Sequence, residues 1–194
     1  MTANPAARPA VIRRIAVYCA SACGSEAHYV RTAREIGALL AAHKIGIVYG
    51  GAHIGLMGAV ADAALERGGE VIGVIPRSLQ QRELAHSALT AMHITESMHE
   101  RKALMMQLCD AFLILPGGLG TLDEMFEAWT WSSLGIHSKR LLLLNVTGYF
   151  DGLLNFLDHA SSAGFVKSEL RSRLEVFGST AQLDAAISQT ITNN

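Results

Sequence analysis

The sequence predicts a single α/β domain built on a doubly wound parallel sheet, a Rossmann-like architecture. Short apolar segments alternate with helical segments of ten or more residues, which is the pattern of a parallel sheet with helices on both faces. Three of the apolar segments lead directly into turns rich in glycine or serine, at residues 21–25, 50–55 and 117–121, as expected where a strand passes into the next helix. Because the carboxyl ends of parallel strands share one edge of the sheet, these three turns are expected to line one cleft. With 194 residues, 50% of them hydrophobic and 17% charged, the chain is long enough for one sizeable core.

The predicted elements follow one another along nearly the whole chain. Residues 1–12 are expected to be a flexible tail, because the first ten carry no apolar signal segment, and residues 13–194 are expected to form the domain. The expected strands are residues 13–19, 45–49, 71–75, 91–95, 111–115, 141–144 and 174–177. The expected helices are residues 26–43, 56–67, 98–108, 122–134, 149–163 and 180–190. Residues 77–89 are less regular and are expected to form a loop with a short helix.

Local signals justify several of these boundaries. The first helix places Ile36, Leu39 and Leu40 at helical spacing. The second helix is expected to end at a pair of glycines, residues 68–69. The motif Ser97-x-x-Glu100 is a capping box that opens the third helix. The helix at 122–134 carries two tryptophans, which indicate either core packing or a dimer face.

The central feature of the chain is the strand, glycine-rich turn and helix between residues 111 and 134. Pro116 ends a continuous apolar run, and three glycines in the next four positions allow a ligand to approach bare N–H groups. Thr121 is expected to be the N-cap of the helix, whose free N–H groups and positive dipole end favour an anion, most often phosphate. Glu124, one turn later, is either a functional acid or the partner of Thr121 in a second capping box.

Known nucleotide-binding fingerprints fit poorly. In the turn at residues 50–55, Ala52 occupies the position of the middle glycine of G-x-G-x-x-G, and the next strand ends without an acid. In the later turn, Asp123 replaces the third glycine. No G-K-[ST] motif is present in the sequence. The sequence therefore argues against both an NAD site and a P-loop.

The amino-acid composition limits which kinds of molecule the protein is expected to bind and where it is expected to be located. The formal net charge is −1, with 16 basic and 17 acidic residues, so neither a nucleic acid nor a membrane surface is an expected partner. The longest apolar runs are too short to span a bilayer. The chain has three cysteines, Cys19, Cys23 and Cys109. An odd number of cysteines without paired spacing predicts reduced thiols and a cytoplasmic location. Cys19 and Cys23 have no second Cys/His pair at zinc-binding spacing, so no metal is expected.

Two adjacent cations, Arg101 and Lys102, lie near the start of the third helix. The helix dipole favours acids at that position, so the two cations need another explanation. They point about 100° apart, so at most one of them heads directly into a given site. An arginine fork suits a phosphate or a charged transition state, whereas a solvated charged face is the alternative.

Three motifs, in this order and at these spacings, resemble one family. They are Tyr49-Gly50-Gly51 followed by residues 55–58, the run at residues 98–102, and Pro116-Gly117-Gly118-x-Gly120-Thr121-x-x-Glu124. Together they resemble the Lonely Guy (LOG) family of cytokinin riboside 5′-monophosphate phosphoribohydrolases, formerly labelled "possible lysine decarboxylase". The resemblance extends from residue 15 to about residue 149 and includes Asn145-x-x-Gly148-Tyr149-Phe150. Ala20, Ala22 and Ala52 depart from the usual family pattern.

The resemblance implies hydrolysis of the N-glycosidic bond of a nucleoside 5′-monophosphate, such as an N6-substituted or plain adenosine monophosphate. The products are the free base and ribose 5-phosphate. Arg101 and Glu124 match the catalytic pair, and no cofactor is required. The positions expected to bind substrate are Ser21, Gly51, Glu83, Lys102, Gly117, Gly118, Gly120, Thr121 and Thr130. A homodimer with sites near its interface is implied as well, and the base is expected near Met98 and Met105.

Two other functions remain as alternatives. A non-catalytic nucleotide carrier or sensor of the same fold would have the same phosphate loop. A lysine decarboxylase would use pyridoxal phosphate on a Schiff-base lysine. The chain has four lysines, at positions 44, 102, 139 and 167, and only Lys102 lies within a site motif, beside an arginine. The decarboxylase is therefore disfavoured.

Overall fold

The computed structural model describes residues 11–80 and 85–192, and within them seven strands form one parallel sheet. The strands are β1 (Arg14–Tyr18), β2 (Gly46–Tyr49), β3 (Val71–Pro76), β4 (Ala91–Thr95), β5 (Ala111–Ile114), β6 (Arg140–Leu144) and β7 (Leu174–Phe177). The helices are α1 (Ala27–Ala42), α2 (Gly55–Leu65), α3 (Met98–Leu108), α4 (Leu119–Ser133), α5 (Asp151–Ser162), α6 (Ser168–Arg171) and α7 (Thr180–Thr192), with a 3₁₀ turn, η1 (Val146–Gly148).

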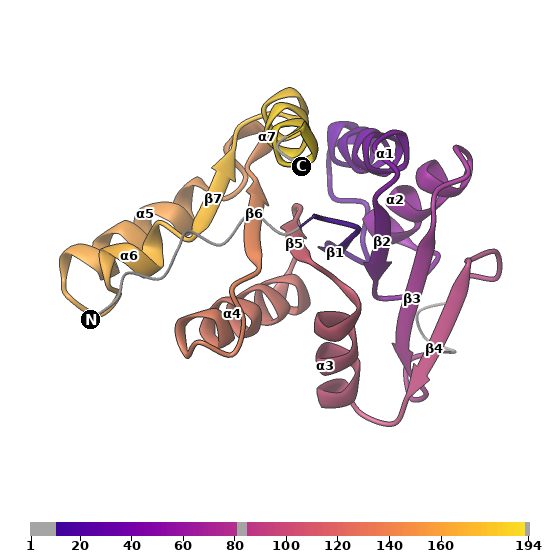
Figure 1. Ribbon diagram of the computed structural model, residues 1–194, viewed down its shortest axis with the longest axis horizontal. Helices are drawn as coiled ribbons and strands as arrows, with labels where there is room; N and C mark the ends of the chain where they lie inside the picture. Colours follow the sequence, from indigo (N-terminus) through magenta and orange to yellow (C-terminus); the bar gives the residue numbers. More distant parts are fainter. Residues whose placement is uncertain (1–10, 81–84, 193–194) are drawn as a thin grey trace.

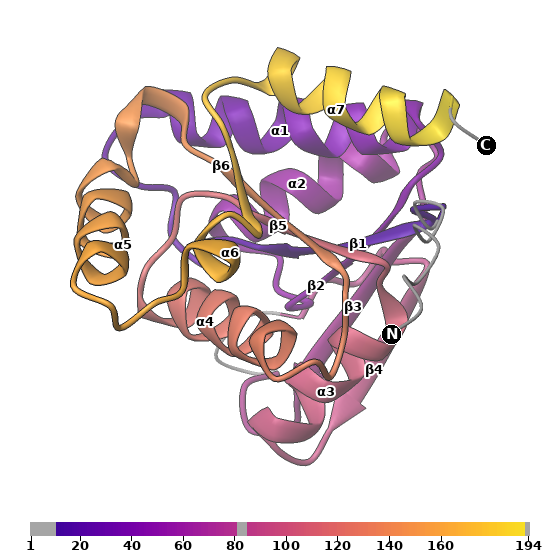
Figure 2. The same ribbon diagram turned by 60° about the vertical axis from the view of Figure 1, so that its left-hand side comes forward.

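The sheet has the strand order β4-β3-β2-β1-β5-β6-β7, and every pair is parallel. Helices α1, α2 and α7 cover one face, while α3, α4 and α5 cover the other (Figure 1; Figure 2). Each face has its own apolar core, which is why the inner strands are apolar along their whole length rather than alternating. The doubly wound parallel sheet predicted from the sequence is confirmed.

The order of the strands reverses between β1 and β5. From β1 the chain moves outward through β2, β3 and β4, and β5 then returns to pair with β1 on its other side. The two strands stay joined past their ends, because the Leu115 N–H donates to the Tyr18 carbonyl at 2.9 Å. In a doubly wound sheet, this reversal opens a crevice at the carboxyl ends of the strands.

The observed elements match the expected ones within one or two residues at most boundaries, with two exceptions. Helix α4 begins at Leu119, three residues before the expected start, and its N-cap is Gly118. Thr121 is therefore inside the first turn, and its expected role as N-cap is wrong. Its side chain packs so closely on Gly117 that a Cβ at that glycine would overlap it. In the second exception, the short helix α6 between α5 and β7 was not predicted.

Residue 12 is the last residue of the expected tail, yet Ile12 is buried in the core on the α1 face. The packed part of the chain therefore begins one residue earlier than expected. Within residues 11–80 and 85–192, no helix is long and apolar enough to cross a membrane.

Candidate active site at the carboxyl edge of the sheet

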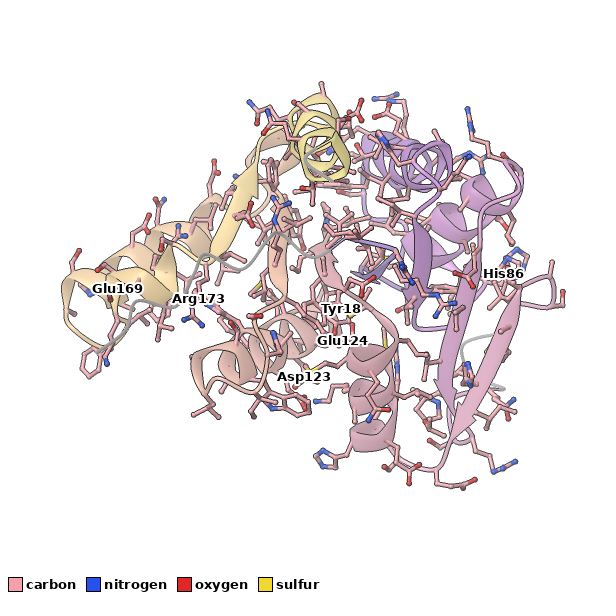
Figure 3. The ribbon with its side chains drawn as sticks, viewed as in Figure 1. Tyr18, His86, Asp123, Glu124, Glu169 and Arg173 are labelled. Atoms are coloured by element: carbon pink, nitrogen blue, oxygen red, sulfur yellow. The ribbon has the colours of Figure 1, made fainter. Side chains whose placement is uncertain are left out.

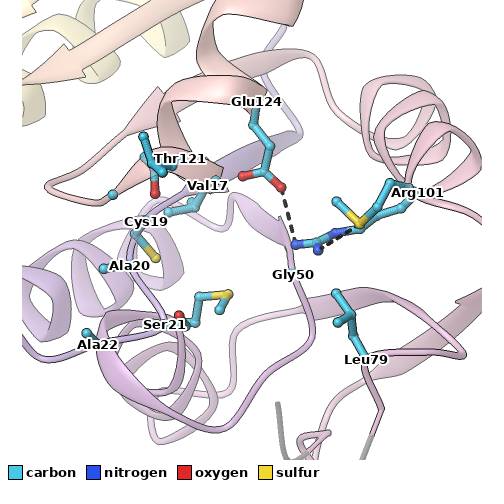
Figure 4. A pocket seen from close by; sticks show the side chains of 15 residues that line it. Val17, Cys19, Ala20, Ser21, Ala22, Gly50, Leu79, Arg101, Thr121 and Glu124 are labelled. Carbon is cyan, nitrogen blue, oxygen red and sulfur yellow. Dashed lines mark hydrogen bonds and ion pairs between the residues drawn. The ribbon is translucent and has the colours of Figure 1, made fainter. Parts of the chain in front are cut away.

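A cavity of about 320 Å³ opens at the point where the strand order reverses. It lies between the carboxyl ends of β1, β2 and β5 and the first turns of α3 and α4 (Figure 4). Its lining consists of Val17, Cys19, Ala20, Ser21, Ala22, Gly50, Met57, Leu79, Met98, Arg101, Gly118, Leu119, Gly120, Thr121 and Glu124. All three turns that the sequence predicts at one sheet edge contribute to this lining.

The cavity contains one buried ion pair. Arg101 from α3 and Glu124 from α4 approach to 3.2 Å between Nη2 and Oε1, and their side chains are only 7% and 9% exposed. Figure 4 shows the two groups pointing toward each other. Within the described part of the chain, the buried Nε of Arg101 has no hydrogen-bond acceptor. Removing two charged groups from water costs free energy, so a buried ion pair adds little to the stability of the fold. Its position in a cavity indicates instead that the pair takes part in the function of the protein.

The start of α3 determines which of its two cations enters the cavity. The Ser97 hydroxyl accepts a hydrogen bond from the Glu100 N–H at 3.2 Å, as the capping box predicts. The Glu100 carboxylate accepts from the Glu96 N–H at 2.8 Å, one residue before the expected partner. With the first turn fixed in this way, Arg101 is directed into the cavity.

Lys102 lies beside the cavity and not in its lining. Its Nζ is 3.0 Å from an Asp123 carboxylate oxygen and also contacts the Glu127 carboxylate, so it links α3 to α4. Burial opposes the charged form, but the hydrogen bonds to Glu127 and Asp123 outweigh it and raise the pKa of Lys102. The expected divergence of the two cations is therefore observed, and Lys102 supports the helix that carries Glu124.

Gly50 allows Arg101 to reach this position. A Cβ at Gly50 would overlap the Arg101 guanidinium and would lie 2.8 Å from the sulfur of Met57. Its neighbour Gly51 has φ +79°, and the Cβ of any other residue there would face Ile75 and Met92. Gly51 is thus required for the turn, whereas Gly50 lines the cavity.

The two glycine-rich turns differ in how their helices begin. At α2, the N–H groups of Leu56 and Met57 donate to the Ala20 carbonyl at 3.1 and 3.2 Å, so the protein itself occupies this N-terminus. At α4, the first turn lines the cavity through Gly118, Leu119 and Gly120. The first N–H groups of a helix have no partner within it, so α4 presents its donors and its positive dipole end to the cavity.

Two titratable groups near the pair, Cys19 and Tyr18, are held neutral. Burial, and then the negative charge of Glu124, raise the pKa of the Cys19 thiol far above neutral pH. The same two causes raise the pKa of Tyr18, whose ring stacks on Phe112 with centroids 5.7 Å apart. Figure 3 shows Tyr18 close to Glu124. Because reactive cysteines need a lowered pKa, Cys19 is unsuited to act as a nucleophile.

The predicted site residues differ in where the structure places them: six line the cavity, four others do not appear in its lining, and one lies outside the described residues. Arg101, Glu124, Ser21, Gly118, Gly120 and Thr121 line the cavity together. Gly51, Gly117 and Lys102 adjoin it without appearing in its lining, and Glu83 lies outside the described residues. Thr130 is exposed farther along α4 and borders a separate apolar cavity beside α5 and α6.

Several lining residues were not predicted from the sequence, and one residue was misplaced. Gly50, Met57 and Leu79 line the cavity but were not predicted as site residues. Gly50 and Met57 belong to a motif that carries the resemblance, so a signal for them was available. Leu79 comes from an irregular loop and has no local signal. Met105, expected near the base, is instead completely buried in the core on the α3 face.

A separate cluster, His53, Asp62 and His86, has the composition of a metal site. However, the imidazole Nδ1 of His86 accepts a hydrogen bond from the Ala88 N–H at 3.1 Å. The neutral ring therefore carries its proton on Nε2, which donates to Asp62 at 3.0 Å. This geometry ties the loop before β4 to α2 and leaves Nε2 no lone pair for a metal. Figure 3 shows His86 well separated from Glu124.

Fold and site together define a doubly wound α/β protein in which one cavity is lined by the first turn of a helix and by a buried Arg–Glu pair. A family model described as "Possible lysine decarboxylase" matches residues 57–187. A cytokinin riboside 5′-monophosphate phosphoribohydrolase of Rhodococcoides fascians is 46% identical over 176 residues, covering 90% of this chain and 88% of that protein. The enzyme LOG of Oryza sativa subsp. japonica is 48% identical over 170 residues, covering 88% and 70%.

The chain therefore belongs to the family of cytokinin riboside 5′-monophosphate phosphoribohydrolases, as the motifs predicted. Solved structures share its fold at lower identity. The Moco carrier protein of Chlamydomonas reinhardtii is 22% identical with a TM-score of 0.68, covering 93% of this chain and 98% of that one. The molybdenum cofactor binding protein of Rippkaea orientalis is 20% identical with a TM-score of 0.66, covering 92% and 95%. These two structures support the fold alone.

The words "lysine decarboxylase" imply pyridoxal phosphate, and the residues present do not fit that cofactor. None of the four lysines lines the cavity. Lys102 is paired with two carboxylates, and the Nζ of Lys139 donates to the Met106 and Cys109 carbonyls at the end of α3. No step of the reaction is assigned to this cofactor.

Proposed function

We propose that this protein hydrolyses the N-glycosidic bond of an N6-substituted adenosine 5′-monophosphate, releasing the free base and ribose 5-phosphate. The observation that carries the proposal is the buried pair of Arg101 and Glu124 in the same cavity as the open start of α4. The curated relatives that are 46% and 48% identical to this chain are named for this reaction. Both Arg101 and Glu124 are present at the matching motif positions.

The 5′-phosphate is assigned to the first turn of α4. Gly118 and Gly120 bring bare N–H groups to the cavity, and Thr121 adds a hydroxyl to its lining. The helix dipole favours a negative charge at this end. Binding energy from the phosphate, which does not react, then holds the ribose in place for the reaction.

The reacting bond is assigned to the space beside Glu124. Breaking the C1′–N bond passes through a state in which the ribose resembles an oxocarbenium ion. A buried carboxylate stabilises that positive charge strongly, because little water screens it. Water supplies an OH group to C1′ and its remaining proton to the departing base, so no other reactant is needed. Arg101, at 3.2 Å, fixes the orientation of the Glu124 carboxylate.

The base is assigned to the apolar part of the cavity. Met57, Leu79 and Met98 line it alongside the Arg101–Glu124 pair. Burying an apolar substituent against such side chains is favourable by about 25 cal/mol per Å². This lining supports a preference for an adenine with an apolar N6 group over plain adenine.

The proposal is tested with a base-release assay. The purified protein is incubated with AMP, isopentenyladenosine monophosphate and the two matching nucleosides. We expect release from the monophosphates only, and a loss of about 10²–10³-fold in kcat for Glu124→Gln, because the charge facing the transition state is removed. Glu169→Gln is the matched control, since this glutamate is exposed on α6, and it is expected to retain full activity.

The carrier alternative makes the opposite prediction in the same assay. Monophosphate binding by wild-type protein without release of any base would replace the hydrolase with a carrier or sensor. Near-normal turnover by a folded Glu124→Gln protein would refute the assignment of Glu124.

We further propose that the active form is a homodimer in the cytoplasm. Leu119 is 88% exposed at the mouth of the cavity, and Leu134 and Ile136 are exposed near the other end of α4. Large exposed apolar side chains favour burial against another surface. All three cysteines are unpaired, in keeping with a reducing compartment. Sedimentation equilibrium is expected to give twice the chain mass of 20.8 kDa, and a monomer mass at micromolar concentration would contradict the dimer.

A further inference from the structure

Tyr149 makes a long-range contact with the glycine-rich turn. Its hydroxyl donates a hydrogen bond of 2.8 Å to the Gly117 carbonyl, which is 32 residues earlier in the chain. Gly117 immediately precedes Gly118, the N-cap of α4. The contact therefore reaches the start of the helix to which the phosphate is assigned, from an element that contributes nothing to the lining of the active-site cavity.

The contact fixes a peptide plane. The Gly117 carbonyl and the Gly118 N–H belong to one planar trans peptide, so they point in opposite directions. Holding the carbonyl toward Tyr149 therefore directs the Gly118 N–H away from Tyr149. Gly118 separates two cavities, the active-site cavity and a smaller one of about 170 Å³ that Tyr149 lines. Glycines at both positions would otherwise let this peptide rotate freely.

The hydroxyl of Tyr149 is itself held in place by its surroundings. Its ring packs edge-on against Tyr29 and Phe150, with centroids 5.6 and 4.8 Å away. The preceding turn is closed by Asn145, whose side chain accepts from the Phe150 N–H and donates to Asp151, both at 2.7 Å.

Backbone geometry restricts the same turn. Thr147 has φ 55° and Gly148 has φ +74°, and a Cβ at Gly148 would overlap Asp151. At a threonine, unlike at a glycine, a positive φ persists only where the surroundings enforce it. The motif Asn145-x-x-Gly148-Tyr149-Phe150 thus forms a rigid support for one hydroxyl group.

We propose that Tyr149 is a positioning residue that orients the Gly117–Gly118 peptide for the 5′-phosphate. It acts through the backbone of the turn and not by contact with the reacting atoms. This inference rests on the proposed function for the identity of the ligand. A donor that is already oriented binds an anion more tightly, because no ordering is required at the moment of binding.

The test is Tyr149→Phe, which removes one hydroxyl and keeps the ring. Loss of a single neutral hydrogen bond corresponds to about a 3–10-fold weakening. We expect KM for the monophosphate and Kd for ribose 5-phosphate to rise by that factor while kcat stays within about twofold, because binding before and during the reaction is weakened equally.

Tyr29→Phe is the matched control. It lies in the same aromatic cluster and lines the same small cavity, and no hydrogen bond joins its hydroxyl to the turn in the described structure. We expect it to leave KM and Kd unchanged. An equal rise in both variants would show that the effect does not depend on the hydrogen bond to the Gly117 carbonyl, and would overturn the inference.

The binding measurement separates this inference from the proposed function. Calorimetry with ribose 5-phosphate needs no turnover, so it reports on Tyr149 even if wild-type protein releases no base. Unchanged affinity in Tyr149→Phe overturns the inference alone, whereas absence of base release by wild-type protein overturns the proposed function alone.

Discussion

The arrangement around Arg101 shows how closely the site depends on single residues. The guanidinium reaches Glu124 only because Gly50 has no side chain, and Met57 lies against the same glycine. Breaking a buried ion pair leaves one charge without compensation, which is more costly than never having buried the pair. Adding a single methyl group at Gly50 is therefore expected to lower the rate of the reaction by displacing Arg101, without any direct contact with the substrate.

Substituting Gly50→Ala tests this dependence. The added Cβ displaces the Arg101 guanidinium from Glu124, and we expect base release to fall at least tenfold while the far-UV circular dichroism spectrum is retained. Gly152→Ala on α5 is the control, because open space surrounds that position and alanine favours the helix. Unchanged activity in Gly50→Ala would mean that the ion pair is not needed in this geometry.

At the scale of elements, the site depends on where two helices begin. Helix α3 starts at a capping box, so its first turn and the direction of Arg101 are fixed locally. Helix α4 starts at a glycine N-cap, and its entry is shaped by Thr121 packing on Gly117. Lys102 then joins the two helices through the Asp123 and Glu127 carboxylates on α4. The Arg101–Glu124 ion pair thus lies where the starts of α3 and α4 come together.

Removal of the α3 cap tests the first of these helix starts. Ser97→Ala removes the acceptor for the Glu100 N–H, and the free energy of unfolding is expected to fall by about 0.5–2 kcal/mol in urea titrations. Base release is expected to fall as well, because fraying of this turn releases Arg101. Ser97→Asp keeps an acceptor at the cap and is expected to restore both quantities. Equal stability of Ser97→Ala and wild type would contradict the capping role.

At the scale of the whole molecule, the carboxyl ends and the amino ends of the strands carry different kinds of contact. The carboxyl edge holds the cavity and its buried ion pair. The amino edge carries contacts that join strands, among them Asp110, which accepts from the Arg13 and Arg14 N–H groups at 2.8 and 2.9 Å. There Arg14 also donates twice to Glu70, at 2.8 Å each. Stability at the amino edge should therefore be separable from activity at the carboxyl edge.

Acid titration of Glu70 tests this separation. The hydrogen bond from Arg14 lowers the pKa of Glu70 below its usual value of 4.5. The contribution of Glu70 to stability is therefore complete above pH 4.5 and is lost as the pH falls through the lower pKa of the folded protein. We expect Glu70→Gln to reduce the free energy of unfolding by about 0.5–1 kcal/mol at pH 7, because the pair is partly exposed, and the difference from wild type to shrink as the pH falls below 4.5. Base release at pH 7 is expected to stay within twofold, and a large loss would contradict the separation of the edges.

The sequence by itself determined the fold class, the positions of the strands and the family. These follow from signals within a few residues of each other, such as apolar runs, capping residues and glycine spacing. It also indicated that three turns share one edge, since parallel strands all end on the same side. Arg101 and Glu124 were predicted as the catalytic pair from the family motifs, and the structure brings both residues to one cavity.

Only the tertiary structure decided which of two similar glycine-rich turns is open. The N–H groups of Leu56 and Met57 are occupied by the carbonyl of Ala20, about 36 residues away, whereas the first turn of α4 faces the cavity. Leu79 enters the lining from an irregular loop, and Tyr149 reaches Gly117 across 32 residues. These contacts join segments far apart in the chain, and local spacing carries no information about which donors and acceptors the fold brings together.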